Sequence, residues 1–223
     1  TGETGTGKEL ITECIHVASS RAQKQLVKMN ASAMPEQLIE SELFGHEKGA
    51  FTGAACTTAG KFEQANGGIL FLDEIGDMSL AGQAKILRAI EGKRIVRLGG
   101  RATLAVDVRI IAATNQDLEL LASEGKFRQD LYYRLNVVRV HLVPLRERRE
   151  DIPLLLEHFV GLFNQRFQAD VRGFTERSWV TLLQYDWPGN VRELKNVLEA
   201  TFINGPRIKI AYADLPKNFR DCA

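Results

Sequence analysis

The feature that most constrains this chain is the stretch "GETGTGKE" at positions 2–9, which fits the pattern G-x-x-x-x-G-K with Gly2, Gly7 and Lys8 in the required places. Glycines let backbone N–H groups turn towards phosphate oxygens, and the start of the following helix adds partial positive charge. The lysine neutralises the β- and γ-phosphates of a nucleotide. The alternative is a glycine-rich turn that merely caps a helix, since the sequence shows no strand before the motif. The stretch predicts a phosphate-binding loop.

An apolar run that ends in two carboxylates is the expected partner of such a loop. Ile69 to Leu72 are all apolar, as in a parallel strand that is buried on both faces, and Asp73 and Glu74 follow directly. At this strand end, Asp73 would hold Mg²⁺ and Glu74 would orient the attacking water. The two carboxylates could instead cap the next helix. Together, the two motifs predict nucleotide hydrolysis.

Position 9 departs from the usual phosphate loop. Most such loops place Ser or Thr there, whose hydroxyl ligates Mg²⁺, whereas this chain has Glu9. Because Mg²⁺ keeps several waters and takes other ligands from phosphate oxygens, Asp73 can suffice as the protein ligand. The glutamate is therefore compatible with hydrolysis, and it points to a particular family.

Strand-like and helix-like segments alternate through the first part of the sequence. Strands are expected over 25–30, 69–72, 109–115 and 137–142, and the strand over 109–115 is expected to be buried like that over 69–72. Helices are expected after Lys8, over 35–43, after Ser79 as N-cap and over 129–135. Cys14 lies on the apolar face of the first helix and is expected in the core. The runs 94–98 and 102–108 flank Gly99-Gly100, which is a hairpin signal. This alternation predicts a three-layer α/β domain with a mainly parallel sheet.

The sequence changes character after "VPLRERRED", which covers residues 143–151. The segments that follow have helical periodicity and are interrupted at Gly173 and at Pro188-Gly189. The expected helices cover 152–167, 175–185 and 191–202. We therefore expect an α/β nucleotide-binding domain over 1–143 and a small, wholly helical domain over 144–223.

Composition narrows the classes of partner. Charged residues make up 26% of the chain but nearly cancel, to a net +1, so no overall basic field favours nucleic acid. The three cysteines, Cys14, Cys56 and Cys222, form no C-x-x-C pair and favour a reducing compartment over a disulfide framework. No apolar run approaches the ~20 residues that a membrane helix needs, and no signal peptide is recognisable. A cytoplasmic protein without membrane contact is expected.

The loop "HEKGAFTGAA" at positions 46–55 places a phenylalanine between glycines. With this loop and the other motifs together, the sequence resembles the central AAA+ ATPase domain of bacterial enhancer-binding proteins, which activate RNA polymerase carrying the sigma-54 factor. The motifs "GETGTGKE", "GAFTGA", "GGILFLDEIGDM", "FRQDLYYRLNV" and "WPGNVREL" occur in the family's order over essentially the whole chain. "GAFTGA" is the most specific of them, because it marks this group within AAA+ proteins.

The resemblance implies a loop that touches sigma-54 as the nucleotide state changes. This loop comprises Gly49, Ala50, Phe51, Thr52, Gly53 and Ala54. Glycines permit a loop to change shape, and an exposed aromatic side chain is costly unless a partner buries it. The alternative is that Phe51 packs into the core of its own domain. By the same resemblance, the hairpin around Gly99-Gly100 is a second loop that moves with the first, although an ordinary exposed hairpin would have the same pattern.

The resemblance also implies which residues act on ATP and Mg²⁺. Those expected to contact the nucleotide are Gly2, Glu3, Thr4, Gly5, Thr6, Gly7, Lys8, Glu9, Asp73, Thr114, Asn115 and Arg192, and Asp73 also holds Mg²⁺. Those expected to act in catalysis are Glu74, Asn30, Arg128 and Arg134. In the family, the asparagine restrains the catalytic glutamate, and the two arginines reach into the site of the neighbouring subunit.

Several of these residues have simpler interpretations. Asn30, Thr114 and Asn115 are of types that often form turns. Arg134 could form an i,i+4 ion pair with Asp130, which would be worth only ~0.3–0.5 kcal/mol. Both roles of Arg134 are compatible with each other.

The motif "WPGNVREL" carries the second sensor of the family. Asn190 can cap the helix, with Glu193 as its capping-box partner. Arg192 then lies in the first helical turn, where a cation opposes the helix dipole by ~0.3–1 kcal/mol. The phosphates of ATP would compensate for this charge, although Glu193 alone could do so and leave Arg192 as a surface residue.

The resemblance thus implies an ATP-hydrolysing activator that forms a hexameric ring and remodels the sigma-54 polymerase at a closed promoter. Another AAA+ machine with different clients is disfavoured by "GAFTGA", and a nucleotide switch without turnover is disfavoured by the intact catalytic residues. Enhancer DNA would be bound only through a helix-turn-helix domain that this sequence does not contain. Because the sequence starts inside the phosphate loop, we expect a truncated fragment that lacks the preceding sheet strand and is poorly stable and weakly active when isolated.

Overall fold

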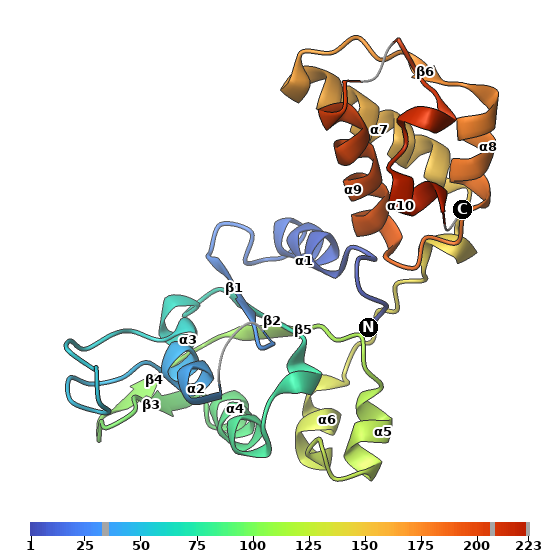
Figure 1. The fold of residues 1–223 in the computed structure, drawn as a ribbon. Coiled ribbons are helices and arrows are strands. Elements are labelled where there is room, and N and C mark those ends of the chain that lie inside the picture. The colour runs from blue at the N-terminus through green and yellow to red at the C-terminus, as the bar shows by residue number, and fades with distance from the viewer. Residues whose placement is uncertain (33–35, 206–207, 222–223) are drawn as a thin grey trace. The chain divides into compact units, whose positions relative to one another are not determined.

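The computed structural model describes residues 1–32, 36–205 and 208–221, which pack as two units (Figure 1). The first unit comprises Thr1 and Lys8–His141, and the second comprises Gly2–Gly7 and Leu142–Ala223. Each unit has its own apolar core. The sequence-based division at residue 144 placed the whole phosphate loop in the first domain, whereas Gly2–Gly7 pack with the second unit.

A parallel three-stranded sheet lies at the centre of the first unit. Its strands are β1 (Leu26–Asn30), β2 (Ile69–Asp73) and β5 (Arg109–Ala112), in the order β1-β2-β5. Leu70 of β2 lies opposite Val27 of β1 and Ile110 of β5. The register brings Asn30 next to Asp73 at the carboxyl ends of their strands. The predicted α/β class with a mainly parallel sheet is confirmed.

Helices cover both faces of this sheet (Figure 1). They are α1 (Lys8–Val17), α2 (Glu36–Phe44), α3 (Lys61–Gln64), α4 (Leu80–Gly92), α5 (Leu118–Ser123) and α6 (Gln129–Leu135). Successive residues of a strand point to opposite faces. Leu70 and Leu72 lie in the main apolar cluster with residues of α2, α3 and α4, whereas Ile69 and Phe71, on the opposite face of the strand, are buried outside this cluster. Strand β2 is therefore buried on both faces, as its apolar run predicts.

Two local predictions in this unit are also confirmed. The hairpin around Gly99-Gly100 is present, because β3 (Arg94–Val96) and β4 (Thr103–Ala105) pair in antiparallel fashion. Helix α4 begins directly after Ser79, whose side chain accepts a hydrogen bond from the backbone N–H of Gly82. Both features depend on residues that are close together in the sequence.

Helix α1 and strand β5 differ from expectation in their burial. Cys14 is exposed rather than in the core, because α1 rests on the sheet through the face that carries Thr12 and Ile15. Strand β5 is only partly buried, because it lies at the edge of the described sheet and pairs with β2 on one side only. Both expectations of full burial are wrong.

The strand expected over 137–142 is also absent from the described structure. In this segment only Leu142 makes a β-bridge, parallel to Gly2. A strand needs a neighbour along its length to satisfy its backbone N–H and C=O groups. Among the described residues, this bridge and a 2.7 Å hydrogen bond from the N-terminus of Thr1 to the carbonyl of Val140 supply a neighbour near the end of the segment and not along its length. Val137 and Val138 are consequently exposed.

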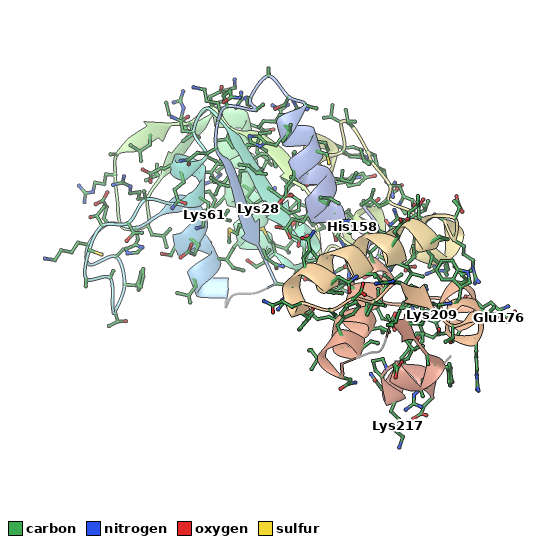
Figure 2. The ribbon with its side chains drawn as sticks, turned by 90° about the horizontal axis from the view of Figure 1, so that it is seen from above. Lys28, Lys61, His158, Glu176, Lys209 and Lys217 are labelled. Carbon is green, nitrogen blue, oxygen red and sulfur yellow. The ribbon has the colours of Figure 1, made fainter. Side chains whose placement is uncertain are left out.

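The second unit is mainly helical. Its helices are α7 (Asp151–Phe167), α8 (Glu176–Gln184), α9 (Asn190–Ile203) and α10 (Lys217–Arg220). Charged side chains such as Glu176 and Lys217 project outward from this unit (Figure 2). The expectation of a wholly helical domain is wrong in one respect, since β6 (Gly173–Phe174) and β7 (Lys209–Ile210) form a short parallel pair. Among the residues described, no helix is long and apolar enough to span a membrane.

Replacing Trp187 with alanine tests the core of the second unit. The indole is fully buried, its Nε1–H donates to the carbonyl of Leu182 at 2.9 Å, and its ring stacks on Phe219. Large-to-small changes at such sites cost about 3–5 kcal/mol. We expect a loss of this size in the free energy of unfolding, measured by urea denaturation of the full-length protein with circular dichroism. Trp179→Ala, at a partly exposed ring, is the control with the smaller loss, and equal losses would contradict the prediction.

Candidate active site

The carboxyl end of β2 carries the two carboxylates of the predicted site, namely Asp73, predicted to hold Mg²⁺, and Glu74, predicted to orient the attacking water. Glu74 has φ 52°, a left-handed conformation that is unfavourable for residues other than glycine. Its backbone N–H donates to Oδ1 of Asp73 at 3.1 Å. Burial, and then the neighbouring charge of Glu74, raises the pKa of Asp73. Two crowded carboxylates with these properties form a site at which a cation is favourable.

Lys8 and Asn115 hold the carboxylate of Glu74 from two sides. Nζ of Lys8 lies 3.3 Å from Oε1 of Glu74, and these side chains are only 9% and 15% exposed. Oε2 of Glu74 accepts a hydrogen bond from the backbone N–H of Asn115 at 3.2 Å. The structure thus brings together three of the predicted site residues. In this arrangement, Lys8 neutralises the carboxylate of Glu74.

Asn30 lies at the same end of the sheet, but its side chain acts locally. Oδ1 of Asn30 accepts hydrogen bonds from the backbone N–H and the hydroxyl of Ser32, both at 2.8 Å. This is the turn-forming interpretation. Thr114 is also engaged in a turn, because its buried hydroxyl oxygen accepts from the backbone N–H of Gln116 at 3.0 Å.

Glu9 is engaged by a cation of the neighbouring strand. Lys28 of β1, labelled in Figure 2, places its Nζ 2.8 Å from Oε1 of Glu9 and also forms an ion pair with Glu13. Glu13 and then Glu9 raise the pKa of Lys28. The carboxylate at position 9 therefore pairs with Lys28 on the exposed side of α1.

The loop residues Gly2–Gly7 belong to the second unit, where they pack against the start of α9. Gly2, Gly5 and Gly7 have φ values of 151°, 82° and 104°, which favour glycine and agree with the phosphate-loop motif. A Cβ atom on Gly5 would lie 2.3 Å from the carbonyl oxygen of Gly189. Glycine is therefore required at this close approach.

The start of α9 differs from the expected cap. Gly189 is the N-cap residue, and its N–H donates to Oε2 of Glu193 at 2.8 Å. Glu193 therefore caps the N–H of Gly189 rather than that of Asn190, and the expected capping box is not formed. Asn190 is the first residue of the helix rather than its cap, and its side chain bonds to the phosphate loop and to the N–H of Leu145. Arg192 is exposed in the first turn.

The two candidate arginine fingers lie at either end of α6. Arg128 forms an ion pair with Asp130, with Nη2 and Oδ2 2.6 Å apart, and this pairing raises the pKa of Arg128. Its backbone N–H donates to Oε1 of Gln83 at 2.7 Å. Asp130, the expected i,i+4 partner of Arg134, is thus paired with Arg128. Arg134 is exposed in the last turn of the helix.

The loop at 49–54 presents its aromatic side chain at the surface. Phe51 is 40% exposed, and its ring contacts His46 edge-to-face with centroids 5.1 Å apart. Backbone hydrogen bonds from Gly49 to Ala54 at 2.9 Å and from Ala54 to Phe51 at 3.0 Å close the loop. The alternative that Phe51 packs in the core is wrong.

An ion-pair cluster at the base of this loop could not be found from the sequence. Arg97, which follows β3, places Nη1 3.0 Å from Glu47 and Nη2 2.7 Å from Glu63. The backbone N–H of Glu47 also donates a hydrogen bond to the carbonyl of Leu98 at 2.9 Å. No spacing in the sequence indicates either carboxylate partner of Arg97.

Comparison with known proteins identifies the family. Residues 1–141 match a family model described as the sigma-54 interaction domain, and residues 146–222 match one described as the AAA+ ATPase lid domain. The chain belongs to the sigma-54 interaction domain family. It is thus a domain of the AAA+ ATPase class, as the motifs indicate.

Relatives and solved structures agree with membership of this family. The transcriptional regulatory protein ZraR of Salmonella typhimurium is 53% identical over 202 residues, which is 91% of this chain and 46% of ZraR. The regulator NtrC of Klebsiella pneumoniae is 50% identical over 222 residues, which is 100% of this chain and 47% of NtrC. The crystal structure of NtrX from Brucella abortus in complex with ADP matches with a TM-score of 0.90 at 39% identity and covers 99% of this chain and 49% of NtrX. The chain therefore spans about half the length of these proteins.

Proposed function

We propose that this chain hydrolyses ATP and uses the hydrolysis to remodel the closed promoter complex of sigma-54 RNA polymerase. The observation that carries the catalytic part is the contact of Lys8 with Glu74 beside Asp73, at the end of a buried parallel strand. Membership of the sigma-54 interaction domain family and the NtrX complexes with ADP and ATP support it. The exposed Phe51 at the tip of the 49–54 loop supports the choice of client.

The geometry at Glu74 suggests how binding and chemistry are coupled. Lys8 is a compact charge that can pair either with the carboxylate of Glu74 or with a phosphate. When a triphosphate binds, Lys8 transfers to it and leaves Oε1 of Glu74 available to accept a hydrogen bond from the attacking water. The N–H of Asn115 keeps the other carboxylate oxygen in place. Glu74 thus becomes active only in the presence of its substrate.

The donor set at this strand end fits Mg²⁺. Asp73 and Glu74 are adjacent hard oxygen donors, and the raised pKa of Asp73 reflects burial and the nearby negative charge that a divalent cation would relieve. In this proposal Asp73 holds the ion, which supplies neutralisation of the phosphate charge.

The remaining roles follow from the resemblance. Thr114 and Asn115 would report on the γ-phosphate, Arg192 would contact the phosphates from α9, and Asn30 would restrain Glu74 in another nucleotide state. The subunits would assemble into a hexameric ring in which Arg128 and Arg134 act on the neighbouring site. Enhancer DNA would be bound by a separate helix-turn-helix domain.

Replacing Phe51 with alanine tests the proposed client. Aromatic residues that a partner buries often contribute 2 kcal/mol or more to binding, which corresponds to about a 30-fold change in affinity. We expect the full-length variant to lose at least this much affinity for sigma-54 in the presence of an ATP transition-state analogue, measured by fluorescence anisotropy. ATP hydrolysis without sigma-54 should change by no more than about twofold.

The matched control is Leu154→Ala, an exposed apolar residue of α7 outside the loop. This variant should bind sigma-54 like the wild type. If Phe51→Ala retains wild-type affinity for sigma-54 while hydrolysing ATP, the client is a different protein. If wild-type protein hydrolyses no ATP at any concentration, the catalytic proposal fails as well.

A further inference from the structure

The phosphate loop carries a negative charge that phosphate binding does not explain. Glu3 lies among the backbone N–H groups of the loop, where a carboxylate would repel a triphosphate. Its two oxygens accept hydrogen bonds from Nη2 and Nη1 of Arg146 at 2.6 and 2.8 Å. Arg146, and then Asn190, lowers the pKa of Glu3 to about 2. The carboxylate is therefore ionised at neutral pH, with its charge compensated by Arg146.

Asn190 connects the same loop to the helices of the second unit. It is fully buried and has φ 53°, a conformation that asparagine tolerates better than most residues. Nδ2 of Asn190 donates to Oε2 of Glu3 and to the carbonyl of Thr4, both at 3.1 Å. Oδ1 accepts from the backbone N–H of Leu145 at 2.7 Å. One side chain therefore joins the loop, the segment before α7 and the first turn of α9.

The loop backbone is also packed directly against the start of α9. A Cβ atom on Gly5 would lie 2.3 Å from the carbonyl oxygen of Gly189 and 3.0 Å from Cβ of Arg192. Nη2 of Arg148 donates to the carbonyl of Thr6 at 3.0 Å. The loop position is thus fixed relative to Arg192 by packing and by hydrogen bonds.

We propose that Glu3, Arg146 and Asn190 form a clasp that positions the phosphate loop for ATP and fixes it relative to Arg192. This inference rests on the proposed function, because it deepens the account of how that site takes its substrate. A glycine-rich loop loses much conformational freedom when a ligand orders it. The clasp orders the loop beforehand and compensates the charge of Glu3. Its members are positioning residues, and they act on ATP affinity rather than on the chemical step.

A double-mutant cycle on Glu3 and Arg146 tests the clasp in the full-length protein. The dissociation constant of a fluorescent ATP analogue (mant-ATP) and the steady-state kcat and KM for ATP are measured for Glu3→Ala, Arg146→Ala and the double variant. We expect each single change to raise the dissociation constant and KM about tenfold, with the larger change in these constants rather than in kcat. The double variant should be no weaker than the weaker single variant, because both changes break one interaction.

Two further variants sharpen this test. Glu3→Gln keeps an oxygen for Asn190 but loses the charge, so its affinity for mant-ATP should lie between those of the wild type and Glu3→Ala. Arg172→Ala is the control, since it removes an exposed arginine of the same unit that pairs with Asp170 away from the loop. It should bind mant-ATP like the wild type. Circular dichroism confirms that each variant is folded.

The outcomes separate the clasp from the function on which it rests. If the changes in Glu3 and Arg146 add in the double variant, or if Arg146→Ala binds mant-ATP as tightly as Arg172→Ala does, the clasp is refuted while the ATPase proposal stands. A fall in kcat with unchanged affinity would also refute it, because positioning would then concern the chemical step. Failure of the wild-type protein to bind mant-ATP at all would overturn the proposed function and the clasp with it.

Discussion

Replacing Glu74 with glutamine is expected to lower kcat for ATP hydrolysis by ~10²–10⁴-fold, because proton transfer and water orientation by a positioned carboxylate contribute a factor of this size. Glutamine has the same shape and keeps an oxygen for the N–H of Asn115, which holds Glu74 at 3.2 Å. The change therefore removes the charge and the basicity with little disturbance of the fold. Steady-state hydrolysis by the full-length protein at saturating ATP measures the effect.

Although Glu74→Gln lowers kcat, it should not weaken the affinity for ATP. In the structure, Glu74 neutralises Lys8 at 3.3 Å and thereby competes with phosphate for that cation. Glutamine removes the competitor, so ATP should bind as tightly as in the wild type or more tightly, measured by titration with mant-ATP. The control is Asp77→Asn, a carboxylate of η1 (Ile75–Asp77) that pairs with the side chain of Gln116. A Glu74→Gln enzyme with a wild-type kcat, or with weakened ATP binding, would contradict this account.

The elements that the sequence predicts correctly are those with local causes. Strand β2 is predicted from an uninterrupted apolar run. The start of α4 is predicted from Ser79, whose hydroxyl oxygen accepts a hydrogen bond from the backbone N–H of Gly82. The prediction that Cys14 would be buried had no such local basis, and it is wrong. Periodicity indicates that a helix is amphipathic, but the sheet selects which face is covered, and α1 rests on Thr12.

The strand predicted over residues 137–142 is absent for a related reason. Val137, Val138 and Val140 have the β-branched composition of a strand, but a strand forms only where another segment supplies hydrogen bonds along its length. Among the described residues, this segment has a bridge from Leu142 to Gly2 and a hydrogen bond from the N-terminus of Thr1 to the carbonyl of Val140, both near its end. Composition therefore predicts the tendency, and the neighbouring backbone decides the outcome.

In the candidate site, the sequence motifs predict which residues are present but not which of them contact one another. The motifs indicate which residues gather at the nucleotide, because phosphate chemistry demands glycines, a lysine and carboxylates at fixed spacings. They do not indicate that Lys8 pairs with Glu74, that Arg128 rather than Arg134 pairs with Asp130, or that Asn190 reaches Glu3. These contacts join residues whose proximity depends on the fold or on rotamers. The sequence therefore predicts the chemistry of the site, and the structure is needed for its electrostatics.

Replacing Arg134 with alanine is expected to lower kcat by ~10³–10⁵-fold if it supplies the transition-state charge to a neighbouring subunit, as arginine fingers do. Arg134 is a cleaner test than Arg128, whose ion pair with Asp130 would be lost as well. Arg134 is exposed, and no carboxylate among the described residues forms an ion pair with it, so its removal should leave the stability of α6 nearly unchanged. Hydrolysis at high protein concentration measures the effect, and Lys126→Ala, which removes an exposed cation paired with Glu124, is the control.

Mixing two inactive variants separates action on a neighbour from action within one subunit. An Arg134→Ala subunit keeps Glu74, and a Glu74→Gln subunit keeps Arg134, so a complete site forms wherever the first receives the arginine of the second. In rings that assemble at random from equal amounts, about a quarter of the interfaces are complete, and hydrolysis should recover accordingly. If the mixture stays as inactive as its components while rings form, Arg134 acts within its own subunit or only on assembly. If Arg134→Ala alone hydrolyses ATP at the wild-type rate, Arg134 is an exposed surface residue and Arg128 is the remaining candidate.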